Sequence, residues 1–253
     1  MTLLARFQPP GGEEQYGMVT DSQVFPLGPN LQDEPSVGET GHALSGVSLL
    51  APALPTKIIN VGYNYLGRVE ELGMPMPEEP FFTYKPPSTV IGTDQVVMCP
   101  PEAAELRYEA ELAVVIKRTA KNVPEADAPA YILGYTACND LNAAAFLKNQ
   151  PARAAGYDGF FPLGPFVATD LDPITLTIEL RVNGELRQRA ECGAARFSPA
   201  QLVSFLSHIM TLHPGDVIST GTPPHPGLAR AGDMVEVTLT GVGTLRNRIV
   251  PHR

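Results

Sequence analysis

The sequence is poor in cysteine and has no long run of hydrophobic residues. Its three cysteines, Cys99, Cys138 and Cys192, lie far apart and form no C-x-x-C pair, so neither a disulfide framework nor a zinc ribbon is indicated. No apolar stretch approaches the ~20 residues needed to cross a bilayer. The start, Met1 to Phe7, lacks the basic and apolar regions of a signal peptide. These absences predict a protein of a reducing cytoplasm with no membrane partner.

Basic residues are also scarce. The chain has 18 Lys and Arg against 27 Asp and Glu, a formal net charge of -9, and no basic run that would neutralise a row of phosphates. We therefore expect no nucleic-acid partner. What the sequence does have is a hydrophobic content of 43% over 253 residues, which is enough to fill the core of one large domain, alone or with a small appendage.

Strand patterns outnumber helix patterns along the chain. The Pro-rich stretch from Ala51 to Thr56 is typical of a joint, and it predicts a small N-terminal β unit over residues 1–50 and a main domain over residues 51–253. Asn183-Gly184, between two strand-like runs, predicts a hairpin turn. The short β-rich runs are Ile58 to Gly62, Gln95 to Met98, Leu112 to Ile116, Ile174 to Val182, Val217 to Thr220 and Met234 to Leu239.

One helix start is well marked, and it follows Ser198. Ser198 and Gln201 have the spacing of a capping box, and Pro199 suits the first helical position. A second helix is expected from Asn142, after a buried strand that ends at Asp140. Both features are local signals of where the backbone changes from extended to helical.

Two glutamates begin an otherwise apolar strand, in Tyr-Glu-Ala-Glu-Leu at 108–112 before Ala-Val-Val-Ile. Side chains alternate along a strand, so Glu109 and Glu111 share one face. Taken alone, a hydrated strand end and a functional pair explain this pattern equally well. Asp140, at the end of the next buried strand, adds a third carboxylate. Such an all-oxygen set suits Mg²⁺ or Mn²⁺, is compatible with Ca²⁺, and does not suit zinc.

Several short motifs follow one another along the chain. They are Lys57 to Tyr65, Phe82 to Ser88, Tyr108 to Leu112, Gly134 to Asp140, Phe161 to Pro165, Met210 to Asp216 and Thr220 to Pro223. With these motifs in this order, the sequence resembles the fumarylacetoacetate hydrolase superfamily from about residue 50 to about residue 250.

The resemblance implies an α+β, β-rich fold: a mixed β-roll or barrel with a few short helices and a small N-terminal β unit. It implies a homodimer, and a Mg²⁺ or Mn²⁺ ion held by Glu109, Glu111 and Asp140. It implies a small 2-oxo or 1,3-dioxo acid as substrate, which chelates the metal while the metal acts as a Lewis acid. It also implies substrate-binding roles for Lys85 and for Thr220, whose hydroxyl would bond the substrate carboxylate.

The chain departs from the family pattern at several catalytic positions. The family often shows G-x-N-Y-x-x-H-x-x-E, whose His and Glu handle a water molecule, but this chain keeps Glu71 and has Arg68 at the His position. Arg cannot act as a base near neutral pH. We therefore predict that Glu71 carries the proton and that Arg68 clamps a distal acid group of the substrate. Arg153 is predicted to bind substrate as a substitute cation. The family's Arg, Gln and Lys near the metal Asp are replaced by Ala144, Leu147 and Ala155.

These features predict a divalent-metal-dependent isomerase or decarboxylase of 2-oxo or 2-hydroxy-dienoic diacids in aromatic-compound catabolism. The similarity of residues 183–188 and 241–250 to the bacterial isomerases and decarboxylases of hydroxyhepta-dienedioate and carboxymethyl-oxo-hexenedioate supports this reading. Two alternatives stay open. One is a hydrolase that cleaves the C–C bond of acylpyruvates, and the other is a catalytically weakened metal-binding subunit that assembles with an active paralogue.

Overall fold

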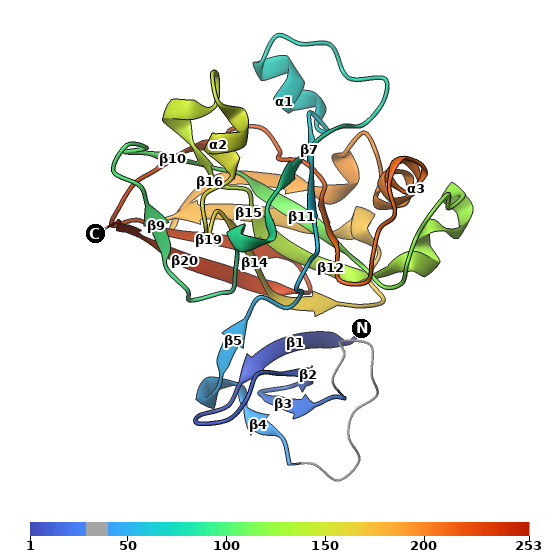
Figure 1. The fold of residues 1–253 in the computed structure, drawn as a ribbon, viewed down its shortest axis with the longest axis vertical. Coiled ribbons are helices and arrows are strands. Elements are labelled where there is room, and N and C mark those ends of the chain that lie inside the picture. The colour runs from blue at the N-terminus through green and yellow to red at the C-terminus, as the bar shows by residue number, and fades with distance from the viewer. Residues whose placement is uncertain (29–39, 253) are drawn as a thin grey trace.

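The computed structural model describes residues 1–28 and 40–252, and strands dominate this part of the chain (Figure 1). Its largest sheet has 12 strands, most of them antiparallel. In spatial order they are β4 (His42–Ala43), β3 (Gln23–Pro26), β2 (Gln15–Thr20), β1 (Leu3–Gln8), β14 (Phe161–Ala168), β12 (Ile132–Asn139), β11 (Ala110–Ile116), β17 (Val217–Ser219), β6 (Ile58–Gly62) and β7 (Phe81–Lys85), with β5 (Ser48–Leu50) beside β1 and β8 (Val90–Ile91) beside β14.

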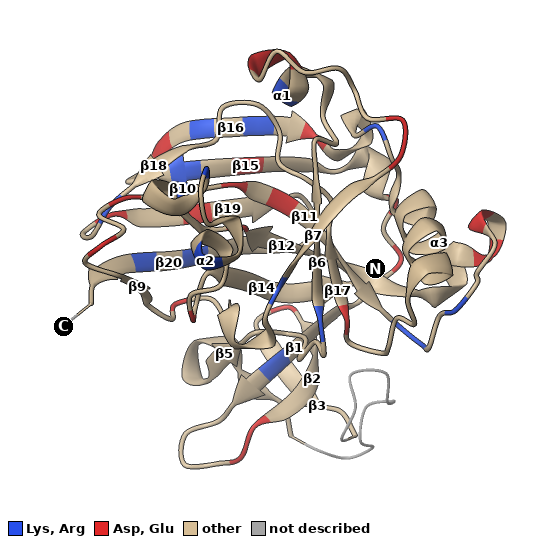
Figure 2. Cartoon of the chain, turned by 45° about the horizontal axis from the view of Figure 1, so that its top comes forward, with Lys and Arg blue, Asp and Glu red and all other residues tan. Residues whose placement is uncertain are grey.

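Two smaller sheets complete the strands of the described part. The first, in spatial order, is β16 (Glu185–Glu191), β15 (Thr177–Val182), β19 (Met234–Leu239), β20 (Gly243–Pro251) and β9 (Val97–Cys99). The second is β13 (Asn142–Ala143), β10 (Leu106–Tyr108) and β18 (Gly227–Ala229). Figure 2 shows acidic residues at both ends of β16 and basic residues between them, at the sheet edge, and such charges discourage pairing with another chain.

The core explains why β11 is apolar from Leu112 to Ile116. Every residue of β11 is buried. Leu112 and Val114 on one face join a cluster that includes Ile178 and Leu180 of β15, so the five-stranded sheet covers that face. Ala113 and Val115 on the other face join a second cluster. A strand covered on both faces has to be continuously apolar. Polar side chains on β11 are therefore confined to its start, at Glu111.

The helices are few and short. They are α1 (Leu66–Glu71), α2 (Pro151–Ala155) and α3 (Pro199–Ile209). The 3₁₀ turns are Leu44–Gly46, Pro87–Thr89, Glu125–Tyr131, Ala144–Phe146, Pro173–Thr175 and Cys192–Ala194. No helix in the described residues is long and apolar enough to cross a membrane.

Local sequence signals placed several elements correctly. The strands expected at Ile58 to Gly62 and at Met234 to Leu239 have those bounds as β6 and β19. Ser198 caps α3 in the expected capping box, since its side chain accepts the N–H of Gln201. At the β15–β16 hairpin, Asn183 and Gly184 both have positive φ, as a tight two-residue turn requires.

The prediction of a helix from Asn142 is wrong. Asn142 and Ala143 form β13, which pairs with Leu106 and Arg107 of β10. The N–H of Ala144 then donates to the carbonyl of Glu105, and α2 begins only at Pro151. The strand expected from Ile174 starts later, at Thr177, because Pro173–Thr175 form a 3₁₀ turn.

The N-terminal strands lie at one end of the molecule, and α1 and α2 lie at the opposite end (Figure 1). β1 pairs with β14 through Leu3 and Leu4, so the N-terminal strands continue the large sheet. The stretch from Ala51 to Thr56 lies at the predicted domain boundary, and its last residue, Thr56, contacts Asp216. One Asp216 oxygen accepts hydrogen bonds from the backbone N–H and the hydroxyl of Thr56, and the other pairs with the Lys57 ammonium at 2.6 Å.

Candidate metal centre

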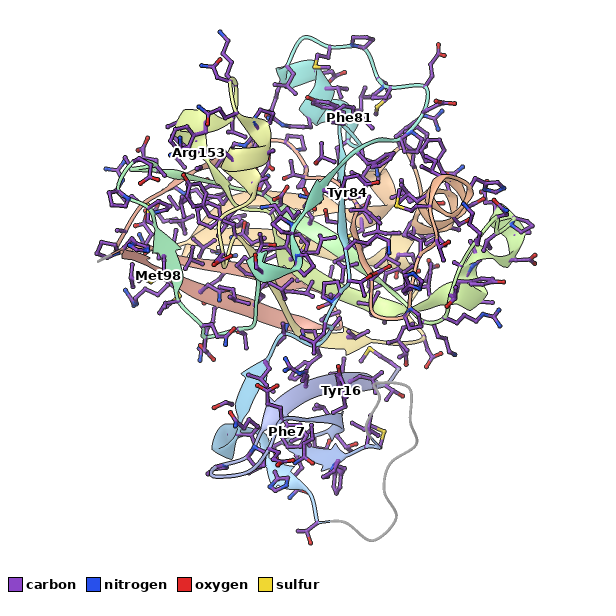
Figure 3. All side chains as sticks on the ribbon, viewed as in Figure 1. Phe7, Tyr16, Phe81, Tyr84, Met98 and Arg153 are labelled. Atoms are coloured by element: carbon purple, nitrogen blue, oxygen red, sulfur yellow. The ribbon has the colours of Figure 1, made fainter. Side chains whose placement is uncertain are left out.

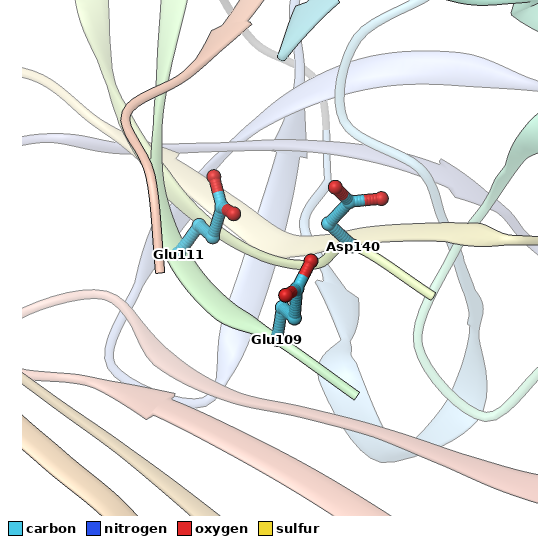
Figure 4. A group of neighbouring side chains, drawn as sticks. All are labelled: Glu109, Glu111 and Asp140. Carbon is cyan, nitrogen blue, oxygen red and sulfur yellow. The ribbon is translucent and has the colours of Figure 1, made fainter. Parts of the chain in front are cut away.

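The three carboxylates singled out by the sequence pattern converge in the structure. Glu109 lies between the end of β10 and the start of β11, Glu111 lies on β11, and Asp140 follows the last residue of β12. The backbone N–H of Asp140 donates to the Glu109 carbonyl at 2.9 Å, which holds the two strand ends together. Each residue offers an oxygen within 4.8 Å of the others. Figure 4 shows the three carboxylates turned toward one another.

The cluster is buried and only partly neutralised. Glu109, Glu111 and Asp140 are 6%, 3% and 7% exposed. Arg107 pairs with Glu109 at 2.9 Å and Lys85 pairs with Asp140 at 2.7 Å. These ion pairs place two cations against three carboxylates.

Neutral donors hold three more of the carboxylate oxygens. The side-chain amide of Asn60 donates to Asp140 at 2.6 Å, and that of Asn142 donates to Glu109 at 3.3 Å. The backbone N–H of Gly221 donates to Glu111 at 2.8 Å. The carboxylates are therefore fixed in orientation.

Burial and mutual repulsion change the acidity of the two glutamates. Burial, followed by the nearby Asp140, raises the pKa of Glu109 to about 7, although Arg107, Arg68 and Lys85 oppose the rise. Burial, followed by Asp140 and Glu109, holds the pKa of Glu111 well above its usual range. A divalent cation would oppose both shifts, because its charge favours the ionised carboxylates. Its all-oxygen donors and surplus negative charge make the cluster fit a hard divalent cation.

A cavity of about 650 Å³ opens onto the cluster. Leu147 and Ala155, two of the positions expected from the sequence resemblance to carry polar groups, line this cavity, so the cavity wall is apolar at both positions. The other lining residues are Asn60, Val61, Gly62, Tyr63, Arg68, Phe81, Thr83, Tyr84, Arg107, Glu109, Glu111, Asp140, Asn142, Pro151, Ala152 and Thr222.

Glu71 and Arg68 lie together on α1. Arg68 lines the cavity and pairs with Glu71 at 3.1 Å. Glu71 also contacts Nδ1 of His225 at 2.7 Å and accepts the His225 backbone N–H. The side chain of Pro224 abuts Gly67, where an added Cβ would lie 2.7 Å from it. The helix that carries Arg68 and Glu71 is thus fastened to the loop that follows Thr222.

The three residues predicted to bind substrate have different surroundings. Lys85 is 2% exposed, and besides Asp140 its ammonium donates to the carbonyls of Leu141 and Phe160. Thr220 is buried and its hydroxyl donates to the Leu112 carbonyl. Arg153 lies on α2 (Figure 3), where Glu102 and Tyr157 hold its guanidinium, and it is absent from the cavity lining. The structure brings Lys85 into the cluster but does not bring Arg153 to it.

Sequence reasoning missed three residues around the cluster: Asn60, Arg107 and Gln188. Gln188 is buried on β16; its side-chain oxygen accepts the N–H of Ala110, and its amide donates to the Thr222 hydroxyl and to the Pro223 and Pro224 carbonyls. It therefore ties the segment between the two glutamates to the loop beside the cavity. Of the three, Arg107 carried a readable signal, because alternation places it on the face of Glu109 and Glu111.

Comparison with known proteins identifies the family. Residues 57–250 match the family profile described as fumarylacetoacetate (FAA) hydrolase C-terminal. The chain therefore belongs to the fumarylacetoacetate hydrolase family.

Its relatives include proteins of known reaction type. A solved structure of 5-carboxymethyl-2-hydroxymuconate delta-isomerase from Mycobacterium smegmatis has 37% sequence identity and a TM-score of 0.92, and the match covers 100% of both chains. That likeness confirms the predicted α+β, β-rich family fold. The homoprotocatechuate catabolism bifunctional isomerase/decarboxylase of Escherichia coli is 43% identical over 208 residues, 79% of this chain and 48% of that protein. The mitochondrial oxaloacetate tautomerase of Xenopus laevis is 38% identical over 221 residues, 81% of this chain and 69% of that protein.

Proposed function

We propose that this protein is a divalent-metal-dependent isomerase or decarboxylase of 2-oxo or 2-hydroxy-dienoic diacids, with a role in aromatic-compound catabolism. The observation that carries the proposal is the buried cluster of Glu109, Glu111 and Asp140 at the floor of a large cavity. The similarity to an isomerase, an isomerase/decarboxylase and an oxaloacetate tautomerase supports the reaction class.

The cluster is proposed to hold Mg²⁺ or Mn²⁺, and Ca²⁺ is compatible with the same oxygen donors. When bound, the cation supplies Lewis-acid stabilisation of the negative charge that develops on the 2-oxo oxygen. The residues around the cluster prepare the site. Lys85 and Asn60 orient Asp140, while Arg107 and Asn142 orient Glu109.

Proton transfer is assigned to Glu71, and Arg68 beside it is the cation for an acid group of the substrate. Arg68 lines the cavity and pairs with Glu71, so the residue proposed to bind the substrate and the residue proposed to transfer the proton are neighbours on α1. Removing or adding a proton next to a carbonyl needs one positioned carboxylate, a contribution of typically ~10²- to 10⁴-fold. Thr220, a substrate-carboxylate ligand in the sequence-based prediction, supports the loop through its bond to Leu112.

Acylpyruvate hydrolysis is the second candidate, because the Glu71 carboxylate contacts an imidazole after all. His225 lies 2.7 Å from Glu71 and is supplied by a loop rather than by position 68. Its exposed side chain, like that of Glu71, is absent from the residues that line the cavity. The reactions of the similar isomerase and isomerase/decarboxylase, rather than this contact, favour the isomerase or decarboxylase reading over hydrolysis.

A spectrophotometric comparison tests the reaction type. We expect oxaloacetate or hydroxydienedioate substrates to be tautomerised or decarboxylated with Mg²⁺ or Mn²⁺, and acylpyruvates to be cleaved poorly. Acylpyruvate cleavage near 10 s⁻¹, an ordinary enzymatic rate, without either of the other reactions would overturn the assignment. An inactive chain that gains turnover only with a paralogous subunit would favour the weakened-subunit alternative.

The metal assignment has its own test. Mn²⁺ at about one hundred times its dissociation constant should stabilise the fold by ~2.7 kcal/mol, which thermal unfolding will detect. Glu109→Gln and Glu111→Gln should each abolish the Mn²⁺-dependent rise in melting temperature. The control Glu179→Gln, on β15 of the five-stranded sheet, should retain it. If both cluster variants respond to Mn²⁺ like the parent, the site is misassigned.

We also propose a homodimer. β7 is the last strand of the large sheet within the described residues, and exposed apolar side chains on and near it, Leu66, Leu72, Met74, Phe81 and Tyr84, suit a second copy of the chain. Figure 3 shows Phe81 and Tyr84 along this strand. Light scattering should give about twice 27.1 kDa; a monomer would favour assembly with a paralogue.

A further inference from the structure

Arg107 faces the metal cluster from the strand that precedes it. It is the middle residue of β10, which runs between β13 and β18. Leu106 and Tyr108 on either side are buried in the core. Since side chains alternate, Arg107 points to the opposite face, the face of Glu109 and Glu111. The backbone pairings on both edges of β10 fix this direction.

The guanidinium of Arg107 has donor capacity that the protein leaves unused. One terminal nitrogen pairs with Glu109 at 2.9 Å. Its Nε is buried and has no hydrogen-bond acceptor among the described residues. Nε itself is closed to a ligand, but the side chain of Arg107 lines the cavity and is 29% exposed. A ligand carboxylate in the cavity can therefore reach the exposed part of this side chain, whose charge favours it.

A second cation lies on the same side of the cluster. Arg107 and Arg68 both line the cavity, and both act electrostatically on Glu109. The ammonium of Lys85, by contrast, already pairs with Asp140 and donates to two backbone carbonyls. The side of the cavity near Glu109 is therefore the cationic side, and a planar guanidinium with free donors suits a carboxylate.

We propose that Arg107 is a substrate-specificity residue that binds the second carboxylate of a dicarboxylic 2-oxo acid. The inference rests on the proposed function, in which the first carboxylate and the 2-oxo oxygen would bind the cation held by the acidic cluster. It assigns the preference for diacids over monoacids to Arg107, with Arg68 as its neighbour.

A simpler role for Arg107 is to neutralise Glu109. The two roles differ in what they predict. A neutralising residue would affect every 2-oxo acid alike, because each one uses the same acidic cluster. A residue that binds the second carboxylate would affect diacids and spare monoacids.

The experiment compares two ligands of five carbons, 2-oxoglutarate and 2-oxopentanoate, which differ in the distal carboxylate. Their dissociation constants are measured by calorimetry on the full chain with saturating Mn²⁺, for the parent, Arg107→Gln, Arg107→Lys and the control Arg246→Gln. Arg246 pairs with Asp94 on the surface, away from the cavity lining. Mn²⁺ binding without acid and the melting temperature establish that each variant is folded and loaded.

We expect the parent and Arg246→Gln to bind 2-oxoglutarate roughly 10- to 100-fold more tightly than 2-oxopentanoate, the range that a charge-assisted hydrogen bond supplies. In Arg107→Gln the ratio should fall several-fold through weaker diacid binding alone, because Arg68 still lines the cavity beside the second carboxylate, and Arg107→Lys should keep an intermediate ratio. Equal weakening of both ligands, or an unchanged ratio, would overturn the proposal. If the parent binds Mn²⁺ but neither acid, both the proposed substrate class and the role of Arg107 are wrong. That outcome differs from a failure of the Arg107 proposal alone, in which the parent still binds the acids.

Discussion

Replacing Lys85 by Met tests how the buried cluster is held together. Met keeps the apolar stem of the side chain but removes the ammonium that contacts Asp140 at 2.7 Å and donates to the Leu141 and Phe160 carbonyls. Without it, Asp140 loses its ion-pair partner next to Glu109 and Glu111. We expect the metal-free variant to be markedly less stable than the parent.

The magnitude follows from burial. Removing one partner of a buried ion pair typically costs ~3–5 kcal/mol, and Lys85 is 2% exposed, so solvent screening is small. For a chain of this size ~1 kcal/mol shifts the melting temperature by ~2–4 °C. The metal-free Lys85→Met variant should therefore melt roughly 10 °C below the parent. Because a cation has been removed beside the cluster, Mn²⁺ should stabilise the variant more than it stabilises the parent.

Differential scanning calorimetry with and without Mn²⁺ measures both effects. Lys57→Met is the matched control, since Lys57 pairs with Asp216 at 2.6 Å outside the cluster; it should lose stability while its Mn²⁺ shift stays that of the parent. If Lys85→Met melts with the parent and has the same Mn²⁺ shift, Lys85 does not support the cluster and the reasoning is refuted.

Further predictions concern acidity, packing and capping. Folding raises the pKa of Glu109 to about 7, so its contribution to metal-free stability is complete below its unfolded pKa of ~4.3 and is lost as pH rises through 7; the Mn²⁺ shift should be larger at pH 8 than at pH 5.5. Burial alone would raise the pKa of Asp216, but hydrogen bonds from Lys57, His213 and Thr56 lower it overall. Its contribution to stability is present above the unfolded pKa and is lost as acid protonates it. Asp216→Asn should lower the free energy of unfolding in urea at pH 7 by ~3 kcal/mol and make stability less dependent on pH in acid. Gln188→Met should cost ~1–3 kcal/mol through its unpaired neighbours and lower kcat/KM about tenfold in the diacid assay, by moving Ala110 and Thr222 relative to each other. Ser198→Ala should cost ~1 kcal/mol by loss of the α3 cap, with an unchanged Mn²⁺ shift.

The features that the sequence predicted best depend on neighbouring residues alone. The capping box of Ser198 needs only Gln201, and the β15–β16 turn needs only Asn183 and Gly184. The shared face of Glu109 and Glu111 follows from alternation along one strand. Such signals have a fixed spacing, so they can be read before the fold is known.

The features that the sequence could not predict depend on distant partners. Asn142 and Ala143 are extended because β10 satisfies their backbone, which a local helix pattern cannot anticipate. His225 meets Glu71 across 154 residues, and Gln188 meets Ala110 across 78. The free donor of Arg107 is likewise visible only when its surroundings are known.

The central claim is that Glu109, Glu111 and Asp140 hold the cation on which a 2-oxo acid binds. Anomalous scattering from a crystal containing Mn²⁺ and oxalate, a mimic of the 2-oxo acid head group, tests it most directly. The account predicts one Mn²⁺ peak bonded to oxygens of all three carboxylates, with oxalate on its cavity side. An empty cluster at saturating Mn²⁺, or a cation bound elsewhere, would contradict it.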